Sequence, residues 1–251
     1  MTPNLLVLGG TTEAAALAAA LAAEGVRATL SFAGRVAHPK AQALPVRNGG
    51  FGGAEGLADW LRAEAITHVV DATHPFAARM SRNAVAASAY AGVPLIALTR
   101  PPWQPRPGDS WTRVLDIASA VRALVRPRQK VFLAVGRMHL GAFAAQPQHR
   151  YLLRLVDAPA DPLPLPDCDV VIARGPFSEP EDRALMQMHG IELVVSKNAG
   201  GPGAVAKIDA ARVLGLPVVM IDRPALPERR TVHEVPEVLD WLFHAGTDLG
   251  V

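Results

Sequence analysis

The stretch at residues 69–77, VVDATHPFA, places polar side chains where an apolar run ends. Asp71 closes that run, and Thr73, His74 and Phe76 follow it closely. An imidazole exchanges a proton near neutral pH, so His74 is the candidate general acid and Thr73 a candidate cofactor contact. A loop histidine without a chemical role, and an Asp71 that only caps the turn, are the structural alternatives.

A glycine-threonine turn lies near the start of the chain, in VLGGTTEA. Gly9 and Gly10 allow close approach to the backbone, and the following helix start favours a phosphate. We therefore predict that Gly9, Gly10, Thr11 and Thr12 bind the phosphates of a nucleotide. The pattern is not GxGxxG, and a plain tight turn with a threonine cap is the alternative.

The next apolar segment ends in SFAGRVAHPK at residues 31–40, which contains no carboxylate. An acidic residue near this point typically binds the ribose diol of NAD. Ser31 and Arg35 suit a 2′-phosphate instead, so the predicted cofactor is NADPH rather than NADH. A solvated basic loop is the alternative interpretation.

A second glycine-rich loop, RNGGFGGAEGL, begins at Arg47. So many glycines before a helix indicate a backbone that lies under phosphates or a flat ring. We predict that Gly50, Gly52 and Gly53 contact the cofactor. A mobile loop around a buried Phe51 would explain the glycines equally well.

These stretches follow short apolar runs that alternate with alanine-rich segments of helical length. Such alternation predicts an α/β protein with parallel sheets covered on both faces. The proline-rich stretch at 99–111 divides the series, so we expect two Rossmann-like lobes with a cleft between them. The predicted divisions are an N-terminal lobe at 1–100, a crossing and helix at 101–126, and a C-terminal lobe with a closing helix at 127–251.

The composition limits the classes of protein. The formal net charge is only +2, which gives no general nucleic-acid signature, and the single cysteine at 168 argues against disulfides and thiolate metal sites. No apolar run approaches the roughly 20 residues of a membrane span, and no basic leader precedes the first strand. We expect a cytoplasmic protein with no metal, no nucleic-acid partner and no membrane partner.

Several enzyme classes lack their motifs here. A short-chain dehydrogenase needs a tyrosine with a lysine four residues later, but Tyr90 and Tyr151 are followed at that spacing by Pro94 and Leu155. A nucleophile elbow, an HExxH motif and a P-loop lysine motif are also missing from the sequence. A two-lobed protein that closes on an anion without catalysis remains an alternative.

Several stretches of the chain together resemble the precorrin-6A reductase family. They are GGTTEA, RNGGFGGAEGL, DATHPFA with Asn83, RPPW, ARGPF, SKNAG and KIDAARVLGLPVVMIDRP. The resemblance runs from about residue 4 to residue 224. It implies NADPH-dependent reduction of a double bond in the precorrin-6A macrocycle to give precorrin-6B, in cobalamin biosynthesis. It also implies two Rossmann-like lobes and transient contact with neighbouring pathway enzymes. The cobalt-containing substrate of the anaerobic route is left open.

Such a substrate carries many carboxylates, and basic residues occur near several predicted strand ends. Guanidinium–carboxylate pairs orient a ligand strongly when partly desolvated. The predicted substrate contacts are Arg47, Phe76, Arg137, Arg174, Lys197, Asn198 and Gly201. For any single arginine, a surface charge without a ligand is the alternative.

Overall fold

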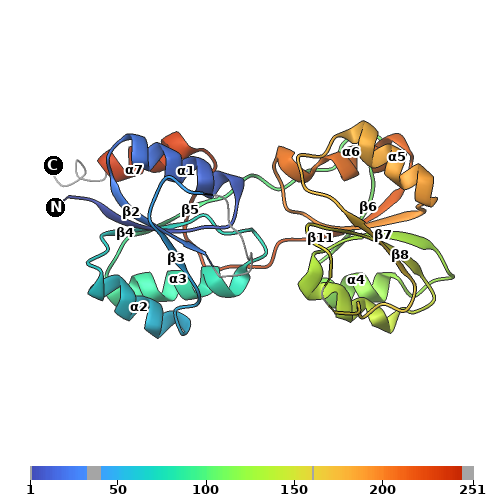
Figure 1. Ribbon diagram of the computed structural model, residues 1–251, viewed down its shortest axis with the longest axis horizontal. Coiled ribbons are helices and arrows are strands. Elements are labelled where there is room, and N and C mark those ends of the chain that lie inside the picture. The colour runs from blue at the N-terminus through green and yellow to red at the C-terminus, as the bar shows by residue number, and fades with distance from the viewer. Residues whose placement is uncertain (1, 33–40, 160, 245–251) are drawn as a thin grey trace. The chain divides into compact units, whose positions relative to one another are not determined.

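The computed structural model describes residues 2–32, 41–159 and 161–244. Arg35, a predicted cofactor contact, lies outside them. The chain forms two compact units: Met1–Pro101 with Ala225–Val251, and Pro102–Pro224 (Figure 1). In the described part of the chain, no helix is long and apolar enough to cross a membrane.

The first unit contains a sheet of six parallel strands in the order β12-β5-β4-β1-β2-β3. This is the strand order 3-2-1-4-5-6 of dinucleotide-binding folds, which reverses between β1 and β4. The strands are β1 (Asn4–Leu8), β2 (Arg27–Phe32), β3 (Val46–Asn48), β4 (His68–Asp71), β5 (Leu95–Leu98) and β12 (Arg230–Val232).

Helices cover both faces of the first sheet (Figure 1). On one face lie α1 (Thr12–Ala23) and α7 (Val235–His244), and on the other α2 (Gly53–Ala63) and α3 (Ala78–Ala91). All five residues of β1, NLLVL, are buried, as expected for a central strand that packs on both sides. The two resulting cores hold the carboxyl ends of β1 and β4 in place.

The second unit contains another sheet of six parallel strands, in the order β6-β11-β10-β7-β8-β9. Its helices also lie on both faces, with α5 and α6 on one and α4 on the other (Figure 1). The strands are β6 (Ser110–Val114), β7 (Lys130–Ala134), β8 (Arg150–Leu155), β9 (Cys168–Ile172), β10 (Leu193–Lys197) and β11 (Pro217–Ile221). The helices are α4 (Ile117–Ala123), α5 (Glu179–His189) and α6 (Ala206–Val213), with the 3-10 segments η1 (Arg137–Ala145) and η2 (Pro202–Ala204).

The two units exchange their outermost strands. After β5 the chain leaves the first sheet and forms β6, which pairs with β11 of the second sheet. After β11 it returns and forms β12, which pairs with β5. A helix follows each of these strands and packs in the same unit: α4 follows β6, and α7 follows β12 and packs against α1.

The predicted fold class, α/β with two Rossmann-like lobes of parallel strands, is confirmed. The structure divides the chain differently from the expected boundaries, because residues 225–251 belong to the first unit and residues 102–126 to the second. The closing helix therefore does not belong to the C-terminal lobe. The strands β6 and β12 were not predicted. The cleft between the lobes stays a prediction.

Candidate active site

The turns that follow β1 and β4 meet at the point where the strand order of the first sheet reverses. Thr11 caps α1, with its Oγ1 accepting the N–H of Ala14 at 3.1 Å. The same hydroxyl donates to the carbonyl of Ala72 at 2.8 Å. One threonine thus joins the glycine turn to the DATHPFA turn, in the place where this class of sheet binds ligands.

The two glycines of the first turn serve different purposes. A Cβ at Gly9 would lie 2.7 Å from Cδ1 of Leu30, so Gly9 is needed for close packing against β2. Gly10 has φ +119°, and a Cβ there would meet no atom of the described residues within 4 Å. The backbone at the start of α1 therefore borders open space, as an amide cradle for phosphate requires.

A carboxylate also lies at the start of α1, which the sequence analysis did not anticipate. Glu13 accepts the hydroxyl of Thr12 at 3.2 Å and Nη1 of Arg100 at 3.2 Å. Burial alone would raise the pKa of Glu13, but the hydrogen bond from its own backbone N–H and the charge of Arg100 outweigh burial and lower that pKa. The helix start thus holds a negative charge that is balanced by one guanidinium.

The glycine loop after β3 is organised by Arg47. Its guanidinium donates to the carbonyls of Gly49 and Gly50, both at 2.8 Å, and lies 3.7 Å from the ring centroid of Phe51. The backbone at Gly52 and Gly53 has positive φ, at 82° and 101°. Arg47 therefore shapes the loop from within.

Within the part of the chain that the structure describes, open space borders three glycines of this loop: a Cβ placed at Gly50, Gly52 or Gly53 would meet nothing within 4 Å. Gly56 differs, because a Cβ there would lie 1.9 Å from the carbonyl oxygen of Phe51. The predicted cofactor glycines are therefore open, whereas Gly56 is needed for the fold of the loop.

Asp71 organises the DATHPFA turn. Its carboxylate accepts the backbone N–H and the hydroxyl of Thr73, at 3.1 Å and 2.7 Å, and forms an ion pair with Arg229. The Asp71 side chain is only 1% exposed. Asp71 therefore caps the turn, which is one of the two roles considered for it from the sequence. Its partner Arg229 was not predicted by any local motif.

His74 is half-buried within that turn. Its Nδ1 accepts the backbone N–H of Phe76 at 3.2 Å, and the two rings lie 5.9 Å apart. Because Nδ1 is an acceptor, the proton of the neutral imidazole is on Nε2. The neutral ring can thus donate a hydrogen bond through Nε2, and the imidazolium form can donate a proton.

The second unit carries a row of cations along one edge of its sheet. In the described residues, each strand has a basic residue at or just beyond its carboxyl end, and parallel strands bring these ends together. The members are Arg113 on β6, Arg223 after β11, Lys197 on β10, Arg137 after β7, Arg154 on β8 and Arg174 after β9. We call this row the basic edge.

Members of the basic edge differ in their exposure. Arg154 is buried in an ion pair with Asp182, and its guanidinium lies 3.6 Å from the ring centroid of Phe177, so it supports the core. Arg137 is exposed at the start of η1. Arg174 is also exposed and pairs with Asp157 at 2.7 Å. The exposed members are available to an anionic ligand.

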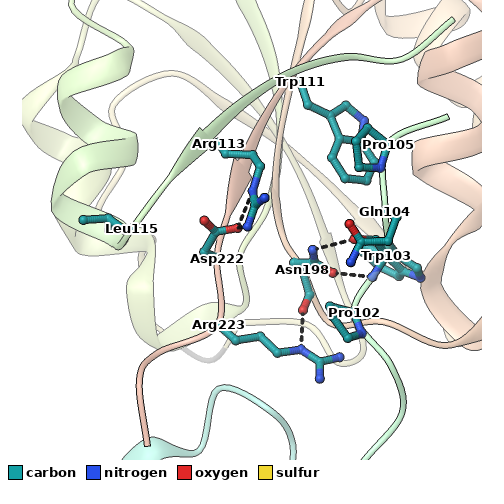
Figure 2. Close-up of a pocket in the computed structure, with 10 residues that line it drawn as sticks. All are labelled: Pro102, Trp103, Gln104, Pro105, Trp111, Arg113, Leu115, Asn198, Asp222 and Arg223. Atoms are coloured by element: carbon teal, nitrogen blue, oxygen red, sulfur yellow. Dashed lines mark hydrogen bonds and ion pairs between the residues drawn. The ribbon is translucent and has the colours of Figure 1, made fainter. Parts of the chain in front are cut away.

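Asn198 and Gly201, which we predicted to bind substrate, hold another segment of the chain. The Asn198 side chain accepts the N–H of Trp103 at 2.8 Å and donates to its carbonyl at 3.0 Å (Figure 2). The indole N–H of Trp103 donates to the carbonyl of Gly201 at 2.8 Å. These contacts make Asn198 and Gly201 supports for Trp103, while Lys197 remains half-buried at the end of β10.

The strand order of the first sheet, with an open glycine turn at its reversal point, defines a doubly wound α/β protein of the Rossmann-like class. The family model described as precorrin-6x reductase CbiJ/CobK matches residues 4–243, and the chain belongs to this family. The resemblance seen in the sequence is thereby confirmed, and the chain is an oxidoreductase of cobalamin biosynthesis.

Individual relatives agree with this assignment. A precorrin-6A reductase of Rhodobacter capsulatus is 57% identical over 249 residues, which covers 99% of each chain. One from Sinorhizobium sp is 48% identical and covers 96% of this chain and 93% of its own. A solved structure named CobK precorrin-6A reductase has a TM-score of 0.92 at 56% identity, covering 99% of this chain and 100% of its own. A cobalt-precorrin-6A reductase of Priestia megaterium is 30% identical, covering 93% of this chain and 95% of its own.

Proposed function

We propose that this protein reduces a double bond of precorrin-6A with NADPH, giving precorrin-6B. The observation that carries the proposal is the junction made by Thr11, which brings an open glycine turn and the His74 turn together at the reversal point of the first sheet. Family membership supports the reductase chemistry, and the relatives named precorrin-6A reductase support the substrate.

The proposed cofactor site follows the carboxyl edge of the first sheet. The backbone amides of Gly10, Thr11 and Thr12 would hold the phosphates, and open space beside Gly10 fits that use. Gly9 would contribute by its small size, because its N–H donates to the carbonyl of Ser31 at 2.9 Å. Thr73 and the open glycines 50, 52 and 53 would line the rest of the dinucleotide. Ser31 and Arg35 would bind the 2′-phosphate, which favours NADPH over NADH. The bound cofactor supplies the hydride.

His74 would supply the proton that follows hydride transfer. The acid would be the imidazolium form of the ring, which becomes neutral when it gives its proton to the macrocycle. Asp71 and Thr73 fix the turn on which the ring is mounted. A positioned imidazole typically contributes on the order of 10²–10⁴-fold as a general acid.

The basic edge of the second unit would bind the acid side chains of the macrocycle. Arg137, Arg174 and Lys197 are the proposed direct contacts, since a guanidinium or ammonium pairs strongly with carboxylate. Phe76 would contact the ring system. Arg47 would support substrate binding through the glycine loop that it shapes, and Asn198 and Gly201 would support it through Trp103.

The identity values favour the cobalt-free substrate. Relatives named precorrin-6A reductase are 57% and 48% identical, whereas the cobalt-precorrin-6A reductase of Priestia megaterium is 30% identical. We therefore propose precorrin-6A, rather than its cobalt complex, as the preferred substrate.

A spectral assay with purified protein tests the proposal. Precorrin-6A, with and without cobalt, is mixed with NADPH or NADH, and the absorbance of both macrocycle and coenzyme is followed. We expect one NADPH to be consumed for each macrocycle reduced, with NADH and the cobalt complex used more slowly. Absence of reduction, or equal use of both coenzymes, would contradict the corresponding part of the proposal.

A further inference from the structure

We propose that a pocket in the second unit binds one carboxylate-bearing, pyrrole-derived ring of the substrate. This inference rests on the proposed function and specifies which part of the macrocycle is held, and where. The pocket has a volume of about 320 Å³ (Figure 2). It is lined by Pro102, Trp103, Gln104, Pro105, Trp111, Arg113, Leu115, Asn198, Asp222 and Arg223.

The position of the pocket is that of a ligand site. Most of its residues lie at or just beyond the carboxyl ends of β6, β10 and β11 or within residues 102–105, whereas Trp111 lies near the amino end of β6; all belong to the second unit. Ligands of open α/β sheets bind beyond these strand ends. The volume lies near the lower limit of small-molecule sites, about 300–1,000 Å³, so it suits one ring with its side chains rather than a whole macrocycle.

The lining combines a flat apolar side with a cationic side. Trp111 and Pro105 lie on one side of the pocket, and Arg113 with Asp222 on the other (Figure 2). Arg223 adds a second guanidinium, so two positive charges face one negative charge. The pocket therefore favours a flat body that carries an anionic group.

Arg113 is the cation best placed to bind that group. Its side chain is 61% exposed, and the guanidinium binds Oδ1 of Asp222 through Nε and Nη2, both at 3.0 Å. A guanidinium has five N–H groups, so donors remain for a ligand carboxylate. Asp222 orients the guanidinium before the ligand arrives, which reduces the ordering cost of binding.

The apolar side is also fixed in advance. Asn198 is 5% exposed and binds the backbone of Trp103 twice, and the indole N–H of Trp103 binds the carbonyl of Gly201. Trp103 is thus held against the segment that follows β10. The SKNAG motif would then serve substrate binding by supporting this wall.

Substitution of Arg113 tests the pocket. In Arg113→Gln we expect KM for precorrin-6A to rise about tenfold, the typical effect of losing one charge-assisted hydrogen bond. In Arg113→Lys the rise should be smaller, since the charge remains. NADPH binding, measured by fluorescence, should be unchanged in both variants. Titration of precorrin-6A by absorbance without coenzyme measures the same affinity when no reduction occurs.

Arg128→Gln is the matched control. Arg128 is 65% exposed and pairs with Asp167 at 2.6 Å, but it precedes the amino end of β7, at the opposite edge of the sheet. Equal effects of the Arg113 and Arg128 variants, an unchanged precorrin-6A affinity in Arg113→Gln, or a loss confined to NADPH would each overturn the pocket assignment. A wild-type protein that binds precorrin-6A through Arg113 without reducing it would instead overturn the proposed function.

Discussion

Arg229 forms a buried ion pair with Asp71, although 158 positions separate them in the chain. Arg229 belongs to the segment that returns from the second sheet, and Asp71 ends β4 beside the His74 turn. A second bond, from Nη2 of Arg82 to the carbonyl of Ala225 at 3.0 Å, holds the same segment against α3. The returning chain therefore supports the turn that carries the proposed acid.

Removal of Arg229 should weaken the fold strongly. Arg229→Met leaves the Asp71 carboxylate buried without its cation, which typically costs about 3–5 kcal/mol. We expect that loss in the free energy of unfolding from urea titration. Adding Asp71→Asn removes the unpaired buried charge and should recover part of the lost free energy of unfolding. Arg230→Met, at the exposed neighbouring position, is the control and should change stability little.

Loss of the His74 imidazole should slow the chemical step and leave coenzyme binding intact. For His74→Ala we expect a single-turnover reduction rate lower by on the order of 10²-fold or more, because no group at that position donates a proton. NADPH affinity should stay at the wild-type value. A variant that reduces precorrin-6A at the wild-type rate across the pH range would show that His74 has no acid role.

The carboxylate of Glu13 should oppose the phosphates of the coenzyme. In Glu13→Gln the negative charge at the start of α1 is lost, so NADPH should bind several-fold more tightly at low salt. Arg100→Gln should shift the affinity in the opposite direction. Fluorescence titrations measure both, and an unchanged pair of affinities would place the phosphates away from this helix start.

Gly56→Ala should distort the glycine loop. The added Cβ would lie 1.9 Å from the carbonyl oxygen of Phe51, and backbone must move to relieve that contact. We expect a loss of about 1–3 kcal/mol in the free energy of unfolding, with weaker NADPH binding. Glu55→Ala, at an exposed position of the same helix, should leave both nearly unchanged. Equal stability of the two variants would contradict the contact.

The stability of the first unit should fall in mildly acidic solution because of His68. Burial lowers the pKa of His68 from its ordinary value of 6.5, and its ring packs 5.1 Å from that of Trp241 in α7. Below pH 6.5, His68 therefore binds a proton in the unfolded chain but not in the folded chain. The free energy of unfolding thus decreases as the pH falls toward the lowered pKa of the folded state. His68→Asn should show a shallower decline, and parallel stability curves for the two proteins would disprove this assignment.

Local patterns in the sequence predicted much of the candidate site. The apolar run NLLVL, the glycine turns and DATHPFA each specify their own conformation over a few residues, and the structure brings the first glycine turn and DATHPFA together through Thr11. The contact between Asn198 and Trp103 could not be predicted from local sequence patterns, because 95 positions separate the two residues.

The sequence alone determined the α/β class, the family resemblance and the turns that can hold a nucleotide. The alternation of apolar and helical segments and the positions of the glycines act over short distances along the chain, so they can be recognised without the tertiary structure. The tertiary structure alone decided which sheet receives β6, β12 and α7, and that Arg229 supports the His74 turn. A strand as short as Arg230–Val232 has too few residues to specify its partner. Its place depends on the free edge of β5 and on burial of α7 against α1, which exist only when both halves of the first unit are assembled.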